Sequence, residues 1–224
     1  MMTKSRFMDN LAKQEKQHHL ENMVAKIDSE FPLEKRVKSA LLSVDRELFV
    51  PQIFKHLSYS LDALPMQEEQ WISSPLTVAK MTQYLEPTGS GRVLEIGCGS
   101  GYQAAVLSKV FDKVFTVERI ESLLTEARGR FRELRIMNIN SKFDDGNRGW
   151  DSFAPFDRIL FSASPELITD AIFDQLAEGG IMVAPVNNQG LQMITRFYKR
   201  NGEITEELIE QCEFVPVVDG TLDK

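Results

Sequence analysis

The sequence predicts an α/β fold with a mostly parallel sheet of seven strands, helices on both faces and a helical N-terminal extension. From Arg92 onward, short apolar runs alternate with segments of helical character. This alternation implies a mostly parallel sheet that is covered on both faces. A glycine-rich turn, residues 97–101, follows the first apolar run. The chain is therefore predicted to divide into a helical extension with a loop, residues 1–75, and an α/β domain, residues 76–224.

The N-terminal extension is predicted to begin with an amphipathic helix that ends near Pro32. Four apolar residues follow the i, i+3, i+4, i+7 spacing of such a helix: Leu20, Met23, Val24 and Ile27. A second helix is expected over residues 33–44, and residues 52–75 are rich in loops. A third helix, residues 76–85, leads into the first strand of the sheet.

The strands of the sheet are predicted from apolar runs and the turn signals between them. They are expected at residues 92–96, 113–118, 138–143, 156–162, 180–185, 191–199 and 208–215. Helices are expected near residues 101–111, 120–134 and 166–177. Gly179-Gly180 indicates a helix end before the fifth strand, and Asn201-Gly202 indicates a tight turn between two antiparallel strands.

The composition favours a globular protein of the cytoplasm. The 224 residues are 42% apolar, and no run is long enough to span a bilayer, so no membrane association is expected. Two cysteines provide neither a metal-binding spacing nor a disulfide framework, and no metal site is expected. The net charge of −7 disfavours a nucleic-acid partner, because lysine and arginine carry most of the affinity for phosphates.

The glycine-rich turn predicts a site for an adenosine-containing cofactor. Glycines allow a close backbone approach to a ligand, and the helix that follows directs free N–H groups toward it. Glu118, at the end of the next strand, can accept hydrogen bonds from ribose hydroxyls. The dinucleotide fingerprint requires a glycine where this chain has Tyr102. A Gly-x-Gly-x-Gly turn after the acid Glu95 resembles S-adenosylmethionine-dependent methyltransferases instead, although an isolated glycine turn is also common in proteins without this site.

Further motifs make the resemblance specific. Between residues 36 and 217 the chain resembles the protein-L-isoaspartate (D-aspartate) O-methyltransferases, which have a Rossmann-like methyltransferase fold and methylate isoaspartyl residues of damaged proteins as the first step of repair. The resemblance depends on Arg46-Glu47-Leu48-Phe49-Val50-Pro51, Ile72-Ser73, the glycine turn with Tyr102-Gln103-Ala104-Ala105, Asp145-Gly146, Gly149-Trp150 and Val215-Pro216.

This resemblance implies a role for each matching position. The implied catalytic residue is Ser73. The residues implied to bind S-adenosyl-L-methionine, and its product S-adenosyl-L-homocysteine, are Glu95, Gly97, Cys98, Gly99, Gly101, Glu118, Asp145 and Gly146. Those implied to bind the isoaspartyl protein or peptide are Ile72, Val215 and Pro216. The oligomeric state is not predicted.

The chain departs from the family in the loop before Ser73. The usual Gly-x-Gly-Gln-Thr-Ile-Ser is replaced by Gln67-Glu68-Glu69-Gln70-Trp71-Ile72-Ser73. Two alternatives therefore stay open. One is a related methyltransferase that acts on another carboxylate or small molecule, and the other is a catalytically inactive adaptor that binds S-adenosylmethionine.

Overall fold

The computed structural model describes residues 4–223 of the chain. Its main sheet has the strand order β5-β4-β3-β6-β7-β8-β9. The strands from β5 to β7 run parallel, and β8 and β9 are added antiparallel. The strands are β3 (Arg92–Ile96), β4 (Lys113–Glu118), β5 (Ile139–Phe143), β6 (Phe156–Phe161), β7 (Leu176–Asn188), β8 (Leu191–Arg200) and β9 (Glu203–Gln211). The prediction of a mostly parallel, seven-stranded sheet is confirmed.

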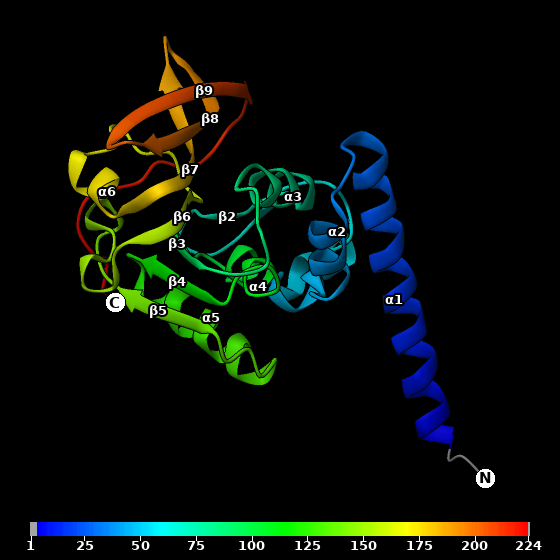
Figure 1. Ribbon diagram of the computed structural model, residues 1–224. Helices are drawn as coiled ribbons and strands as arrows, with labels where there is room; N and C mark the ends of the chain where they lie inside the picture. The colour runs from blue at the N-terminus through cyan, green and yellow to red at the C-terminus, as the bar shows by residue number, and fades with distance from the viewer. Residues whose placement is uncertain (1–3, 224) are drawn as a thin grey trace.

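Six α-helices accompany the sheet within the described residues. They are α1 (Lys4–Glu30), α2 (Lys35–Leu42), α3 (Pro75–Tyr84), α4 (Tyr102–Leu107), α5 (Glu121–Glu133) and α6 (Asp170–Asp174). Figure 1 shows α1 as a long rod beside α2, on the side of the molecule away from β7, β8 and β9. The four apolar residues predicted to form its buried stripe are all buried. In the described part of the chain, none of the helices has both the length and the apolar character to cross a bilayer.

Alternate residues of the strands face two separate cores, as the period of two in a strand requires. Val93 and Val114 pack in one core with residues of α1 to α5. Their neighbours Leu94 and Phe115 face the other core, which contains Ile172 of α6. Helices thus cover both faces, although the second face carries only the short α6 and the 3-10 turns at residues 146–148 and 151–153.

The segment before β7 differs from the prediction. The helix expected over residues 166–177 is only α6, residues 170–174, and β7 already begins at Leu176. Gly179-Gly180 lies inside β7 and does not end a helix. From Phe156↔Leu176 to Arg158↔Ile181, β7 advances by more residues than β6, so β7 bulges there. Gly179, with φ +75°, supplies the left-handed conformation that bulges often need.

The last strand also differs from the prediction. The Asn201-Gly202 turn is confirmed, with φ values of +53° and +77°, and Arg200 pairs with Glu203 directly across it. The strand was expected at residues 208–215 but occupies 203–211. Its first half is mostly exposed and rich in glutamate, as is common in edge strands. Because this half of the strand contains no apolar run, the hydrophobic pattern does not indicate where the strand begins.

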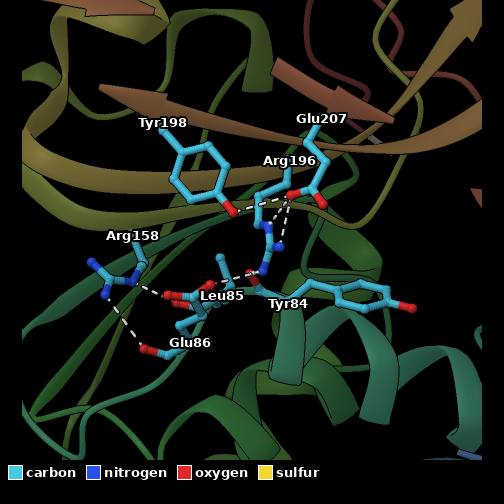
Figure 2. A network of polar contacts seen from close by, with 7 residues as sticks. All are labelled: Tyr84, Leu85, Glu86, Arg158, Arg196, Tyr198 and Glu207. Atoms are coloured by element: carbon cyan, nitrogen blue, oxygen red, sulfur yellow. Dashed lines mark hydrogen bonds and ion pairs between the residues drawn. The ribbon is translucent and has the colours of Figure 1, made fainter. Parts of the chain in front are cut away.

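A polar network anchors the end of α3 to the sheet (Figure 2). Arg196 of β8 lies between Glu86 and Glu207, at 2.9 and 2.7 Å. Arg158 of β6 donates to the carbonyl of Leu85 at 2.5 Å. Because basic side chains stabilise the carbonyl end of a helix, these contacts hold α3 in position. The opposite end of α3 begins at Pro75, two residues after Ser73.

Candidate active site

A cavity opens at the carboxyl ends of β3, β4 and β6, where ligands bind in open α/β sheets. Residues 70–73 and residues 215–218 line two of its walls. The cavity brings together most of the predicted site residues: Ile72, Ser73, Gly97, Cys98, Gly99, Glu118, Gly146, Val215 and Pro216. Three predicted cofactor-binding residues, Glu95, Gly101 and Asp145, do not line it.

The glycine turn after β3 presents its backbone to the cavity. Gly99 has φ +50°, and a methyl group added at its Cα would meet no atom within 4 Å, so the turn is open on this side. Gly101 is required for packing inside the protein rather than for an open approach to the cavity. A methyl group there would lie 2.7 Å from Phe131 of α5, so this glycine allows the turn to pack on α5. The predicted role of Gly101 in contacting the cofactor therefore has no direct support from the geometry.

Glu118 ends β4 and faces the turn. Its carboxylate accepts hydrogen bonds from the N–H of Gly99 at 2.8 Å and of Ile120 at 3.0 Å. Burial raises the pKa of this carboxyl even though both hydrogen bonds favour its charged form. Each carboxylate oxygen retains further acceptor capacity. Glu118 can therefore still accept hydrogen bonds from a ligand in the cavity.

Glu95 lies beneath the turn rather than in the cavity. Its side chain is fully buried and accepts hydrogen bonds from the hydroxyls of Thr116 at 2.6 Å and Ser162 at 3.1 Å. Burial raises the pKa of Glu95 to about 8. This acid supports the floor of the site, and it reaches the cavity through Ser162, which lines it.

Asp145 is turned toward the C-terminal segment. Its two carboxylate oxygens accept from the N–H of Asn147 and of Gly220, each at 2.9 Å. The C-terminal segment also pairs with Ser164 after β6 and, through Leu222, with Arg119 after β4. It therefore crosses the edge of the sheet over the cavity.

The loop before α3 carries Ser73 and Trp71. Strand β2 (Trp71–Ile72) pairs with β1 (Leu64–Pro65) in a short hairpin. At its tip, Glu68 and Glu69 have φ values of +57° and +56°. Glu69 thus keeps a left-handed backbone at a position where the family has glycine. Trp71 lines the cavity and is 53% exposed.

The two serines that follow this hairpin have separate roles. Ser74 caps α3, because its hydroxyl accepts from the N–H of Thr77 at 3.0 Å. Ser73 lines the cavity, and its hydroxyl has no hydrogen-bond partner among the residues whose side chains are described, residue 11 and residues 13–223. Of these two serines, Ser73 is therefore the one whose hydroxyl is available to a ligand.

Sequence reasoning missed several lining residues. Tyr102 and Gln103 lie in the motif after the glycine turn, for which the resemblance implies no role. Val217 and Val218 directly follow the Val215-Pro216 motif. All four residues line the cavity. Gln103 donates to the hydroxyl of Thr82 at 2.9 Å, which joins α4 to α3. The C-terminal valines enter the site only because the segment crosses the sheet edge, and no local sequence signal marks that path.

Comparisons with known proteins agree with the site. A family model described as Protein-L-isoaspartate(D-aspartate) O-methyltransferase matches residues 15–222. The protein-L-isoaspartate O-methyltransferase of Helicobacter pylori (strain G27) is 56% identical over 199 residues, which cover 88% of this chain and 95% of that protein. The corresponding protein of Vibrio parahaemolyticus serotype O3:K6 is 41% identical over 204 residues, 91% of this chain and 98% of that protein.

Solved structures show the same architecture. A protein-L-isoaspartate O-methyltransferase superposes with a TM-score of 0.80 and 25% identity, covering 89% of this chain and 66% of that chain. A Plasmodium falciparum structure described as a β-aspartate methyltransferase, in complex with S-adenosyl-L-homocysteine, superposes with a TM-score of 0.75. At 22% identity, with 91% of this chain and 98% of that chain covered, this second match shows the fold alone.

The matches extend over the N-terminal extension, the glycine turn and the C-terminal segment. The family model covers most of the chain, and both bacterial relatives exceed 40% identity. The family predicted from the motifs is confirmed, and with it the Rossmann-like methyltransferase fold. This chain belongs to the protein-L-isoaspartate(D-aspartate) O-methyltransferase family.

Proposed function

We propose that this protein transfers the methyl group of S-adenosyl-L-methionine to the free carboxylate of L-isoaspartyl residues in damaged proteins and peptides, which begins their repair. The observation that carries the proposal is a single cavity that joins the glycine turn and Glu118 to Ser73. One half of this cavity suits an adenosine cofactor, and the other half suits a peptide carboxylate.

The residues present fit the cofactor. The open backbone at Gly99 gives room for a close approach, and Glu118 offers acceptors for the ribose hydroxyls. Gly146 lines the same end of the cavity, where the adenine edge is expected. When bound, S-adenosylmethionine supplies a methyl group that its sulfonium already activates. Glu95, Gly101 and Asp145 are proposed to support this half from behind, because none of them lines the cavity.

Methylation of a peptide carboxylate requires no general base. The reference pKa of such groups is about 3.3–4.3, so the nucleophile is already ionised at neutral pH. The task of the site is to hold the carboxylate oxygen in line with the methyl carbon and to exclude water, and positioning of this kind contributes about 7–11 kcal/mol. In the proposed reaction the new O–C bond forms as the C–S bond breaks, and no proton is transferred.

Ser73 is the proposed catalytic residue. Ser73 lines the cavity, and its hydroxyl has no hydrogen-bond partner in the described part of the chain, whereas the hydroxyl of the neighbouring Ser74 is occupied as a helix cap. A neutral hydroxyl can donate to the substrate carboxylate without trapping it as a charged group would. Ile72, Val215 and Pro216 also line the cavity and are proposed to contact the peptide.

The remaining assignments stay predictions. Isoaspartyl proteins and peptides are the proposed partners, and the net charge of −7 argues against nucleic acid. A location in the cytoplasm and a boundary near residue 75 between the extension and the methyltransferase domain also stay predictions. The two alternatives, another carboxylate substrate or an inactive adaptor, are motivated by the altered loop at residues 67–71.

The proposal is tested by incubating the protein with labelled S-adenosylmethionine and an isoaspartyl peptide. We expect a methyl ester, recognised because base releases its label as methanol, and a loss of about 10- to 150-fold in kcat/KM for Ser73→Ala. Transfer to a base-stable position would contradict the proposal. Cofactor binding without any turnover would favour the adaptor.

A further inference from the structure

Arg46 is a fully buried cation whose role the reaction described above does not include. It begins the 3-10 helix Arg46–Phe49, and its side chain is 0% exposed. Its guanidinium donates to four main-chain carbonyls, those of Ser58 at 2.8 Å, Asp62 at 2.9 Å, Ser73 at 3.1 Å and, at the longest distance, Ser60 at 3.5 Å. Arg46 therefore joins the loop at residues 58–62 to the main chain of the proposed catalytic serine.

The positive charge of Arg46 has no close counter-ion among the side chains that the structure describes, those of residue 11 and residues 13–223. None of their carboxylates lies within the 4.0 Å of an ion pair with this side chain, and the Nε of Arg46 has no hydrogen-bond partner among them. Burial lowers the pKa of Arg46, and the more distant Asp62 opposes that effect. Burying an unpaired charge is costly. The carbonyl dipoles offset part of this cost, and the rest of the positive charge remains beside Ser73.

Arg46 also contacts the cofactor side of the cavity. Its guanidinium carbon lies 6.0 Å from the ring centre of Tyr102, the first residue of α4. Tyr102 lines the cavity next to the glycine turn. The buried side chain of Arg46 thus connects the loop that carries Ser73 with α4, the helix that follows the glycine turn.

We propose that Arg46 is a positioning residue for methyl transfer, which holds Ser73 in place through its main-chain carbonyl and attracts the substrate carboxylate with its uncompensated charge. This inference rests on the proposed function of the site. The two effects are separable. Loss of positioning lowers kcat, because the carboxylate is no longer held in line. Loss of charge raises KM, because the substrate carries a full negative charge in the ground state that diminishes as the ester forms.

Two substitutions distinguish these effects. Arg46→Lys keeps a positive charge, but the three donors of an ammonium group lie on a single nitrogen and cannot reproduce the planar guanidinium fork that reaches four carbonyls. We expect kcat to fall about tenfold, with KM for an isoaspartyl peptide changed by less than about twofold. Arg46→Met removes the charge as well, and we expect an additional rise of about fivefold in KM. Binding of S-adenosylhomocysteine should stay within about twofold of wild type for Arg46→Lys.

Arg158→Lys is the matched control. Arg158 also donates only to main-chain carbonyls, those of Leu85, Glu86 and Asp157. It lies at the opposite end of α3 from Ser73. This control should lower the melting temperature as Arg46→Lys does, without a tenfold change in kcat.

A double-mutant cycle decides whether Arg46 acts through Ser73. In the Ser73→Ala background, Arg46→Lys should lower kcat by less than about threefold, because the hydroxyl it positions is absent. Additive effects, or equal kinetics for Arg46→Lys and Arg158→Lys, would overturn the inference. If wild type itself failed to methylate the isoaspartyl peptide, the proposed function would fail instead. Arg46→Met only extends the test, so its failure to fold would leave the Arg46→Lys result decisive.

Discussion

Replacing the buried Glu95 with glutamine should change how the stability of the free protein depends on pH. Burial raises the pKa of this carboxyl to about 8 from its ordinary value of 4.5. Between these two values the folded state holds one proton more than the unfolded state. The free energy of unfolding therefore falls by roughly 1.4 kcal/mol for each pH unit in this window. The contribution is fully present below pH 4.5 and is lost as the pH rises through 8.

Glutamine removes this dependence, because it does not titrate and can still exchange hydrogen bonds with Thr116 and Ser162. From about pH 5.5 to about pH 7.5, wild type should lose roughly 2.7 kcal/mol more than Glu95→Gln. The raised pKa of Glu118 contributes to both proteins. The difference between them therefore reports Glu95 together with its coupling to Glu118, whose charge adds to the raised pKa of Glu95.

The measurement is urea unfolding at three pH values across this window, with the slope m compared to confirm that both proteins expose the same surface. Glu133→Gln, at an exposed position of α5, is the control and should follow wild type. If Glu95→Gln and wild type lost stability in parallel to within about 0.5 kcal/mol, Glu95 would not carry a raised pKa, and the description of the floor of the site would be wrong.

Three further predictions follow from the contacts. Glu118→Ala should weaken the binding of S-adenosylhomocysteine by roughly 1.5–3 kcal/mol in calorimetry, and an unchanged affinity would place the ribose elsewhere. Trp71→Thr should change KM for isoaspartyl peptides more than it changes cofactor affinity, because the exposed indole lines the cavity beside Ser73; the reverse pattern would assign Trp71 to the cofactor. Arg196→Met should lower the free energy of unfolding by about 1 kcal/mol, because the ion pairs of Arg196 with Glu86 and Glu207 are partly exposed. KM should be unchanged, because these ion pairs lie at the end of α3 opposite Ser73. A changed KM would show that these contacts influence the site.

The parallel part of the fold could be predicted because its strands are buried on both faces. Strands β3, β4 and β6 appear in the sequence as short segments in which apolar residues predominate, and the observed bounds agree with the prediction to within a residue. Two strands could not be placed in this way. β9 is an exposed edge strand with many glutamates, and β7 begins with a bulge whose glycines resemble a helix end.

The site was predictable where one short segment determines its geometry. The glycine turn and Glu118 are such a case, because a left-handed backbone and the end of a strand are local features. The roles of Glu95 and Asp145 were not predictable. Their partners, Ser162 and Gly220, lie far away in the sequence and approach only in the folded chain. Arg46 is similar, because the four carbonyls that accept from it come from two other segments.

The measurement that tests the central claim most directly is methyl transfer to two peptides of the same composition, one with an L-isoaspartyl residue and one with the ordinary L-aspartyl residue at the same position. We expect one equivalent of S-adenosylhomocysteine for each methyl ester formed on the isoaspartyl peptide, and a rate on the aspartyl peptide near background. Equal methylation of both peptides, or turnover only on an unrelated carboxylate, would contradict the proposed function.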